Sequence, residues 1–454
     1  MALLFYFPGS QIPLSIAGLI KKVNYHEPNP DLEKKVHVII PVKNEEQRIP
    51  YALGSLLSQD YKNLELTVVN NLSSDRTYEV AKEITQSFPR EYQAIVLDNK
   101  EPGKTPSIKM AMRERPGRDL TFILDADTYL TDTNYVSTLA AQFDNPKVGS
   151  AFGTVKPIRP KEVGRAYQRF VVEMFSEEGS RRQDLEDLHE APTRRKSLLD
   201  KMISVRQDAI EQIVEASKPK TKIGLLDKMV IAHRASLYSF DQRFIKRGQM
   251  GLYGTTTYPI GCGVMYDTSL IGDIFSEYEK KLGDNLTSSE DIFLGFAIRE
   301  RGRCNFYVPS VHMETAEPKM SKYFKQNKMW NSSFMQSSFY FRKHAFKMFS
   351  TKGEYEKAMG ASIVFPLLEK VTYPAFLAYF TAVGNYEAVL AALGFEIAAY
   401  AAINFCAAEK GYRFKSLADL MYAEPLRMAS FFSEVYTSAK FAKDLITKNR
   451  NWRK

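Results

Sequence analysis

The chain has 454 residues, of which 44% are apolar and 25% charged, so it is too long for one ordinary core and is not disordered. The mean hydropathy of −0.31 argues against a polytopic membrane protein but leaves room for one or two apolar spans. Three cysteines are too few for a disulfide framework and indicate a reducing compartment.

The formal net charge is +9, and residues 409–454 contribute much of it, with ten Lys or Arg against five Asp or Glu. A basic, aromatic-rich tail beside apolar stretches favours anionic lipid headgroups as a partner over nucleic acid. A solvated helical face is the alternative interpretation of the same charges. We expect a membrane surface as a partner and no nucleic acid.

The chain opens with an apolar segment, residues 1–35, which prolines and glycines interrupt. It lacks the basic start and the cleavage site of a signal peptide, and we interpret it as a short interfacial or packing segment. From residue 36 strands and helices alternate, four times in roughly 90 residues, which predicts a parallel α/β sheet. The expected strands are VHVIIPV, LELTVVN, QAIVLD and LTFILDAD.

Polar side chains follow each of these expected strands, where ligands gather in a parallel α/β sheet. They are Lys43-Asn44-Glu45, Asn70-Asn71, Asp98 and Asp125-Ala126-Asp127.

Residues 36–163 therefore form the first expected half of one domain, an α/β half whose strand ends would hold a ligand. Residues 164–250 have dense mixed charge at helical spacing and predict a helical insertion, with a solvated cap favoured over a functional lid. Strand and turn character resumes in residues 251–350, the expected acceptor-binding half, which ends in an aromatic, basic helix. Residues 351–454 form the last expected unit, of membrane-associated helices and the basic tail.

Two apolar segments, residues 361–384 and 386–408, are long enough to approach a bilayer span. Glu369 and Lys370 interrupt the first segment, and Glu387 and Glu396 lie in the second. An ionisable group at mid-membrane costs about 3 kcal/mol on insertion scales. The sequence therefore fits two full spans and an interfacial hairpin equally well.

Asp125 and Asp127 follow the apolar strand TFIL and are spaced to face one cation. Carboxylate oxygens are hard ligands that suit Mg²⁺ or Mn²⁺, and such an ion would hold a diphosphate. An isolated Asp-x-Asp also occurs by chance in loops. Upstream, Gly103-Lys104 precedes a helix and offers a cation and free N–H groups to phosphate, unless it is a surface turn.

Glu290 and Asp291 fall in the first turn of the helix predicted for SSEDIFLGFAIRERG. The helix dipole stabilises carboxylates at this position, which alone would account for them. The functional interpretation is that one of them faces a cleft as a general base.

Taken together, these motifs resemble the family 2 glycosyltransferases, inverting enzymes of the GT-A fold. The matching segments come in the family's order: IIPVKNEEQRIPYALGSLLSQDY, VVNNLSSDRT, GKTPSIK, LDADT, SSEDIFLGFAIRERG and TAEPKMSKYFKQNKMW. The last segment resembles the T-x-E-x-P…Q-x-x-R-W region of cellulose, chitin and hyaluronan synthases. The resemblance covers roughly residues 36–330 without the helical insertion, and it implies an α/β GT-A sheet with flanking helices.

The resemblance also implies roles for individual residues. Asp291 would be the catalytic base, with Glu290 beside it. Asp127 and Asp125 would hold Mn²⁺ or Mg²⁺, and His312 stands where several family members place a third metal ligand, although a lone histidine is more often structural. The implied nucleotide-sugar-binding residues are Pro41, Asn44, Glu45, Asn70, Asn71, Lys104, Asp125, Gln326 and Trp330.

Three positions depart from the family pattern. Met329 replaces the arginine of Q-x-x-R-W, Lys109 replaces the asparagine of the Gly-Lys segment, and Asn70 or Asn71 stands where an aspartate contacts the nucleobase. A methionine cannot clamp phosphate, and a processive enzyme is therefore in doubt. An asparagine can accept or donate a hydrogen bond, so a UDP-sugar is the favoured but not the only donor.

We therefore expect a metal-dependent inverting glycosyltransferase that moves a sugar from a nucleoside-diphosphate sugar to a hydroxyl of a glycan or lipid-linked acceptor. It would be membrane-associated, with its active site on the cytoplasmic side; the oligomeric state is left open. The alternatives are a catalytically decayed nucleotide-sugar-binding scaffold and a nucleotidyltransferase. The latter predicts a Gly-rich basic loop after the first strand, where this chain has PVKNEEQR.

Overall fold

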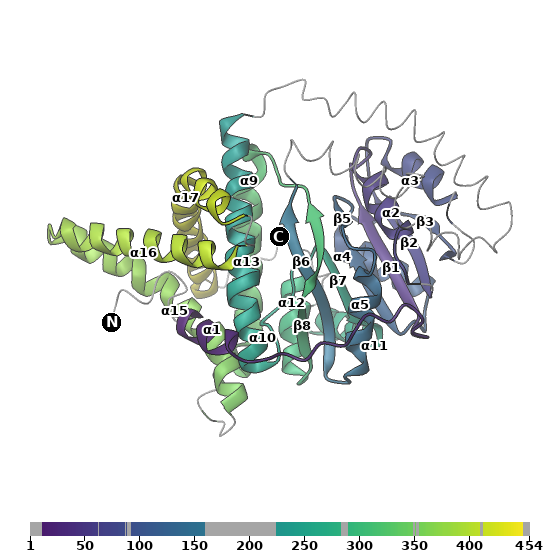
Figure 1. The fold of residues 1–454 in the computed structure, drawn as a ribbon, viewed down its shortest axis with the longest axis horizontal. Helices are drawn as coiled ribbons and strands as arrows, with labels where there is room; N and C mark the ends of the chain where they lie inside the picture. Colours follow the sequence, from purple (N-terminus) through teal and green to yellow (C-terminus); the bar gives the residue numbers. More distant parts are fainter. Residues whose placement is uncertain are drawn as a thin grey trace.

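The structure is a computed structural model, and it describes residues 11–61, 63–86, 88, 92–158, 224–282, 289–347, 350, 354–408 and 412–447. Its centre is an eight-stranded mixed sheet in the order β3-β2-β1-β4-β7-β6-β8-β5. Figure 1 shows this sheet on one side of the molecule and the C-terminal helices on the other, with α9 and α13 between them. The strands are β1 Val36–Val42, β2 Leu64–Asn71, β3 Ile95–Asn99, β4 Leu120–Leu124, β5 Thr128–Leu130, β6 Val148–Pro157, β7 Gly263–Asp267 and β8 Cys304–Thr315.

The first four strands form the parallel half of the sheet that the sequence predicts. β1 pairs in parallel with β2 and β4, and β2 pairs in parallel with β3. Every residue of β2 is buried, because a strand in the middle of an α/β sheet is covered on both faces. The helices around this half are α2 Ile49–Leu57, α3 Thr77–Gln86, α4 Lys104–Glu114 and α5 Tyr135–Ala141, followed by the 3-10 turn η3 Gln142–Asp144.

The second half of the sheet is mixed. β7 runs antiparallel to β4 and β6, β6 runs parallel to β8, and β5 is antiparallel to β8. Two helices pack on this half, α11 Thr268–Leu282 and α12 Glu290–Glu300. The junction of the two halves, at the ends of β4 and β7, carries the polar motifs of the candidate site.

Most of the expected helical insertion, residues 159–223, lies outside the described residues. Its described end consists of α9 Leu225–Tyr238, the π-helix η4 Ser239–Lys246 and α10 Arg247–Tyr253. The interpretation of a solvated cap is wrong for this end, because His233, Arg234 and Lys246 are all buried. α9 packs against α17, and so forms an inner wall of the protein.

The N-terminal helix α1 Gln11–Leu19 is a packing segment. It lies against α10, where the backbones of Gly18 and Gly248 come so close that a Cβ atom on either residue would clash with the other helix. Residues 1–10 of the expected apolar segment lie outside the described part of the chain.

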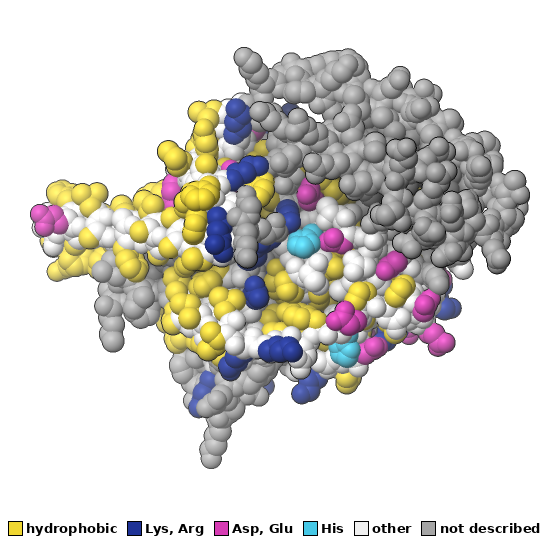
Figure 2. Space-filling view, in the orientation of Figure 1, with side chains coloured by type: hydrophobic (Ala, Val, Ile, Leu, Met, Phe, Trp, Pro, Cys, Tyr) yellow, Lys and Arg dark blue, Asp and Glu magenta, His cyan; other side chains and the backbone are white. Residues whose placement is uncertain are grey.

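The C-terminal region is helical, and two of its helices are strongly apolar. After α13 Met320–Tyr340 and α14 Arg342–Phe346 come three long helices, α15 Glu354–Ala382, α16 Tyr386–Ala407 and α17 Arg413–Ile446. Residues 360–382 and 386–407 are long and apolar enough to cross a membrane by length and composition. Exposed apolar side chains cover the projecting α16 in Figure 2, among them Leu390 at 68% exposure.

Candidate active site

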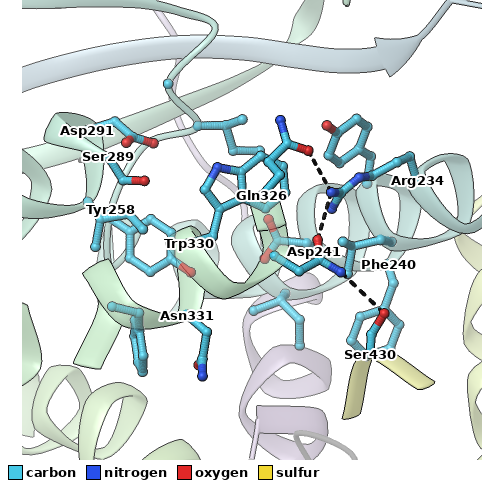
Figure 3. Close-up of a pocket in the computed structure, with 18 of the residues that line it drawn as sticks. Arg234, Phe240, Asp241, Tyr258, Ser289, Asp291, Gln326, Trp330, Asn331 and Ser430 are labelled. Carbon is cyan, nitrogen blue, oxygen red and sulfur yellow. Dashed lines mark hydrogen bonds between the residues drawn. The ribbon is translucent and has the colours of Figure 1, made fainter. Parts of the chain in front are cut away.

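A cavity of about 760 Å³ opens at the ends of β4 and β7. Its size lies within the range of small-molecule sites. The walls come from the sheet, α9, η4, α12, α13 and the C-terminal helices, as Figure 3 shows for part of the lining. Of the sequence-predicted residues, the cavity brings together Lys104, Asp125, Asp127, Glu290, Asp291, Gln326 and Trp330.

Lys104 joins the two acidic motifs. Its Nζ lies 2.7 Å from Asp125 Oδ1 and 2.6 Å from Glu290 Oε1. Burial lowers the pKa of Lys104, but the two carboxylates outweigh burial and hold this pKa above its usual value. The ammonium therefore stays charged, and it fixes the end of β4 against the first turn of α12.

The loop before Lys104 is held by Asn71. Asn71 Oδ1 accepts a hydrogen bond from the Gly103 N–H at 2.9 Å, and its Nδ2 donates to the Glu101 carbonyl at 2.8 Å. Gly103 has a φ of 128°, which a residue with a side chain rarely adopts. Asn71 therefore positions the start of α4, and its amide has both hydrogen-bonding ends occupied.

The neighbouring Asn70 has a different environment. Its Nδ2 donates to Asp98 Oδ1 at 2.9 Å, which orients the amide. Its Oδ1 is buried and accepts no hydrogen bond from the described residues. A buried acceptor without a partner is costly, so this oxygen is suited to receive an N–H from a ligand.

The site around Asp127 carries excess negative charge. Burial, followed by the charges of Asp125 and Glu45, raises the pKa of Asp127 to about 7. Glu317 adds to this effect, whereas Arg48 opposes it. A group of carboxylates that raise one another's pKa is the environment that a divalent cation neutralises.

Asp291 lies in the first turn of α12, deep in the cavity. Burial and the charge of Glu290 raise the pKa of Asp291 to about 7, against the opposing charge of Lys104. A Cβ atom at Gly261 would lie 2.7 Å from the Asp291 carboxyl carbon, so only glycine leaves room for this carboxylate. The residue before the helix, Ser289, has a φ of 43° and makes no side-chain capping bond. A carboxylate with a pKa near neutrality is suited to take up a proton.

Arg234, on α9, is the residue at this site that sequence reasoning missed. Only 1% of it is exposed, and its Nη2 donates to Gln326 Oε1 at 2.8 Å and to Asn327 Oδ1 at 2.7 Å (Figure 3). Its guanidinium carbon lies 4.3 Å from the centre of the Trp330 ring. The mixed charge of its segment is typical of a solvated helix, so the sequence held no pattern that singles it out.

Several predicted residues lie outside the lining of this cavity. His312 Nδ1 lies 3.0 Å from Asp132 Oδ2, and the expected role of His312 as a third metal ligand stays a prediction. Asn44 accepts a hydrogen bond from the Ser74 N–H at 2.8 Å and so ties two loops together. The other predicted residues outside the lining are Pro41, Glu45, Asn70 and Asn71.

The opposite end of the cavity reaches the C-terminal helices. Lys370, which interrupts the apolar α15, donates to Asn331 Oδ1 at 2.7 Å and pairs with Glu434 at 2.6 Å. Glu396 of α16 is buried and pairs with Arg427 of α17. Glu369, Lys370 and Glu396, which complicate a membrane span in the sequence, thus line the cavity, whereas Glu387 is exposed.

The fold and the site define an α/β protein with an acidic cavity at the ends of its central strands. Its sequence matches the model of Glycosyl transferase family 2 over residues 37–214. Glycosyltransferase GlyA of Streptococcus pneumoniae is 30% identical over 108 residues, which are 24% of this chain and 15% of GlyA. The chain thus spans only a small part of that curated relative. Residues 37–214 are therefore similar to a family 2 glycosyltransferase domain.

One solved structure agrees with this similarity at the level of the fold. The mannosyltransferase PcManGT from Pyrobaculum calidifontis, in complex with GDP-Man and Mn²⁺, superposes with a TM-score of 0.51 at 16% identity. The match covers 95% of this chain and 96% of PcManGT. TarS 1–349 from S. aureus covers 90% of this chain at 15% identity, with a TM-score of 0.38. The fold is therefore GT-A, as the resemblance predicts, and a C-terminal helical region with two apolar helices follows it.

Proposed function

We propose that this protein is an inverting glycosyltransferase that transfers a sugar from a nucleoside-diphosphate sugar to a hydroxyl group. The observation that carries this proposal is the bridge of Lys104 between Asp125 and Glu290. It holds the carboxylates expected at the donor diphosphate and the carboxylates expected at the acceptor within one cavity. The family match over residues 37–214 supports the same reaction class.

The donor side of the site fits a divalent cation. Among the described residues no three His, Cys, Asp or Glu side chains form a ready metal cluster. The diphosphate would therefore supply the remaining oxygens, beside Asp127 and Asp125. When bound, Mn²⁺ or Mg²⁺ would neutralise charge on the diphosphate leaving group. The raised pKa of Asp127 supports this fit, because it shows that nearby positive charges do not balance the carboxylates around Asp127.

Asp291 is the proposed general base. Its carboxylate would take the proton from the acceptor hydroxyl as the oxygen attacks the anomeric carbon. The bond between that carbon and the diphosphate oxygen breaks in the same displacement, so the configuration inverts. A pKa of about 7 suits this task, since the group is partly ionised at neutral pH and basic enough to hold the proton.

The donor nucleobase is proposed to present an N–H group to Asn70. Because Asp98 orients the Asn70 amide, the free oxygen of Asn70 is an acceptor. Uracil and guanine carry a ring N–H on the pairing edge, and cytosine presents an amino N–H there. UDP-sugars and GDP-sugars are the first donor classes to compare, and PcManGT was solved in complex with GDP-Man.

The acceptor is proposed to enter from the C-terminal helices, because the cavity continues from Trp330 to residues of α15, α16 and α17. A glycan or a lipid-linked glycan at a membrane surface fits this arrangement, since the exposed apolar face of α16 lies in the same region. The active site would face the cytoplasm, in agreement with three free cysteines.

The test is release of nucleoside diphosphate from a panel of UDP- and GDP-sugars with Mn²⁺, in membranes that carry the natural acceptors. Release from one donor, with the sugar appearing in inverted configuration, is the expected result. Release of pyrophosphate from a sugar phosphate and a nucleoside triphosphate would instead identify a nucleotidyltransferase. Binding of nucleotide sugar without any release would identify a decayed scaffold.

A further inference from the structure

The Q-x-x-R-W segment lacks its arginine, but an arginine from another helix lies beside it. Met329 occupies the arginine position on α13, is 41% exposed and lines the cavity. A thioether carries no charge and donates no hydrogen bond. A guanidinium beside Trp330 instead comes from Arg234 on α9, a segment that the family motifs do not include.

Arg234 contacts four side chains of α13. Its Nη2 holds the side-chain oxygens of Gln326 and Asn327, at 2.8 and 2.7 Å. Its guanidinium carbon lies 4.3 Å from the centre of the Trp330 ring and 4.9 Å from that of Tyr323. Figure 3 shows Arg234 reaching from α9 toward Gln326 beside the Trp330 ring.

A second contact anchors the guanidinium to the segment's upstream end. Arg234 Nε lies 3.3 Å from Glu317 Oε2, and both side chains are nearly fully buried, at 1% and 4% exposure. A buried charge is tolerated only when it is paired, so Arg234 and Glu317 each need the other. The guanidinium thus joins Glu317, Gln326 and Trp330, all of which line the cavity.

We propose that Arg234 replaces the missing motif arginine as a positioning residue, holding Gln326 and Trp330 at the boundary between donor and acceptor. This inference rests on the proposed glycosyl transfer and deepens it. Arginine suits the role because its planar fork can donate to two side chains and stack on an indole at once. The active site would therefore depend on α9, although α9 lies outside the regions that the motifs identify.

The experiment compares four full-length variants: Arg234→Met, Arg234→Lys, the double variant Arg234→Met/Met329→Arg, and Lys228→Met as a control. Lys228 is an exposed cation on the same helix. We expect Arg234→Met to lower kcat by about 100-fold, because a misplaced positioning group is costly to the chemical step. The KM for the donor should change by less than about threefold, since Arg234 does not itself bind the donor.

The double variant supplies the decisive comparison. An arginine at position 329 should restore at least about tenfold of the lost kcat, because it returns a guanidinium to the motif position. Unchanged kcat in Arg234→Met, or no recovery in the double variant, would overturn the proposal. If Arg234→Met does not fold, Arg234→Lys serves instead: it keeps the charge but loses the fork, and its expected loss is about tenfold.

A spectroscopic measurement separates this inference from the proposed function. The chain has two tryptophans, Trp330 and Trp452, so Trp452→Phe leaves Trp330 as the single reporter. In that background Arg234→Met should shift or intensify Trp330 emission, whereas Lys228→Met should not. Unchanged emission would show that Arg234 does not hold Trp330. The emission of Trp330 can be measured even if the protein turns over no nucleotide sugar. An absence of turnover would count against the proposed function alone.

Discussion

Lys104 Nζ lies 2.6 Å from Glu290 Oε1, and this ion pair connects the two acidic motifs of the site. Lys104 begins α4 and Glu290 begins α12, so two helix N-termini meet at one point. Asp125 shares the same ammonium at 2.7 Å. Among the residues that the structure describes, Asp291, the next residue along α12, forms no ion pair of its own. This difference between two adjacent carboxylates underlies the first two predictions.

Asp291→Asn is expected to lower kcat by at least about 100-fold, because an amide cannot take up the acceptor proton. Affinity for the nucleoside diphosphate should stay near that of the wild type, since the proposed donor ligands are unchanged. Steady-state kinetics and titration calorimetry measure the two quantities. Asp273→Asn, the same change at an exposed position of α11, is the control. Near-normal turnover in Asp291→Asn would show that another group is the base.

The activity is expected to rise with pH through about 7. Asp291 has its pKa raised to about 7 by burial and the charge of Glu290, and only its carboxylate form can accept a proton. Below this pKa, kcat/KM should fall about tenfold per pH unit. Glu290→Gln removes the negative charge that raises the pKa of Asp291, and it frees Lys104. The rise of kcat/KM with pH should therefore move to lower pH by about one unit. If activity rose at the same pH in this variant as in the wild type, the assignment of Asp291 as the base would be contradicted.

Asp127→Asn is expected to stabilise the metal-free protein at pH 8 and to abolish its response to Mn²⁺. The folded-state pKa of Asp127, about 7, exceeds the ordinary value of 3.8, so the folded form binds more protons between these values. Stability therefore falls as pH rises from about 4 through 7. Removing the charge should raise the free energy of unfolding by an amount on the order of 1–3 kcal/mol, and the Tm should rise with it.

Thermal unfolding with and without Mn²⁺ measures both effects of Asp127→Asn. In the wild type the added ion should raise Tm at pH 8, because it binds the folded state. Asp273→Asn should keep this increase. An Asp127→Asn variant that Mn²⁺ still stabilises to the wild-type extent would place the cation elsewhere.

Asn70→Asp is expected to weaken both the fold and donor binding, even though an aspartate is the usual residue of the family motif. The substituted carboxylate would face Asp98 Oδ1, which now accepts a hydrogen bond from Asn70 Nδ2 at 2.9 Å. Two like charges at that distance should cost on the order of 1–3 kcal/mol of unfolding free energy. Urea denaturation and nucleotide titration provide the measurements.

The double variant Asn70→Asp/Asp98→Asn restores one amide and one carboxylate in reversed order. It should recover most of the lost free energy of unfolding, which a double-mutant cycle of the two single variants and the double variant measures. If Asn70→Asp alone were as stable as the wild type, the Asn70–Asp98 contact would have no energetic weight.

Leu390→Glu/Phe395→Glu is expected to reduce binding to lipid vesicles by more than tenfold. Both side chains are more than half exposed on α16, and burying such a side chain in an apolar phase stabilises by about 1.5–3 kcal/mol. Co-sedimentation with vesicles of neutral and anionic lipid measures the loss. The control is Leu225→Glu/Leu226→Glu, an equally exposed apolar pair on α9. Equal vesicle binding by the two variants would show that α16 is not the helix that binds the membrane.

The sheet and the acidic motifs could be predicted because each depends on local sequence. β1, β2 and β4 are short apolar runs that end in polar residues, and a buried parallel strand needs that pattern. The family's motif spacing then identified Asp125, Asp127, Glu290 and Asp291, which share one cavity.

Contacts between distant segments were not predictable in the same way. Arg234 meets Trp330 only because α9 packs beside α13, and no local pattern encodes that packing. Asn70 and Asn71 are identical in sequence terms, yet one faces Asp98 and the other the loop before Lys104. Their roles depend on partners that β3 and α4 supply.

The cavity wall that α15, α16 and α17 provide has a practical consequence. A fragment ending near residue 350 would keep the sheet, Asp127 and Asp291, and so could still bind a nucleotide sugar. It would lose Lys370, Glu396 and Arg427, which line the end of the cavity proposed for the acceptor. Water would then reach the anomeric carbon from the side that the C-terminal helices close. Such a soluble fragment should hydrolyse its donor rather than glycosylate, so the apolar helices would act as a barrier to water as well as an attachment to lipid.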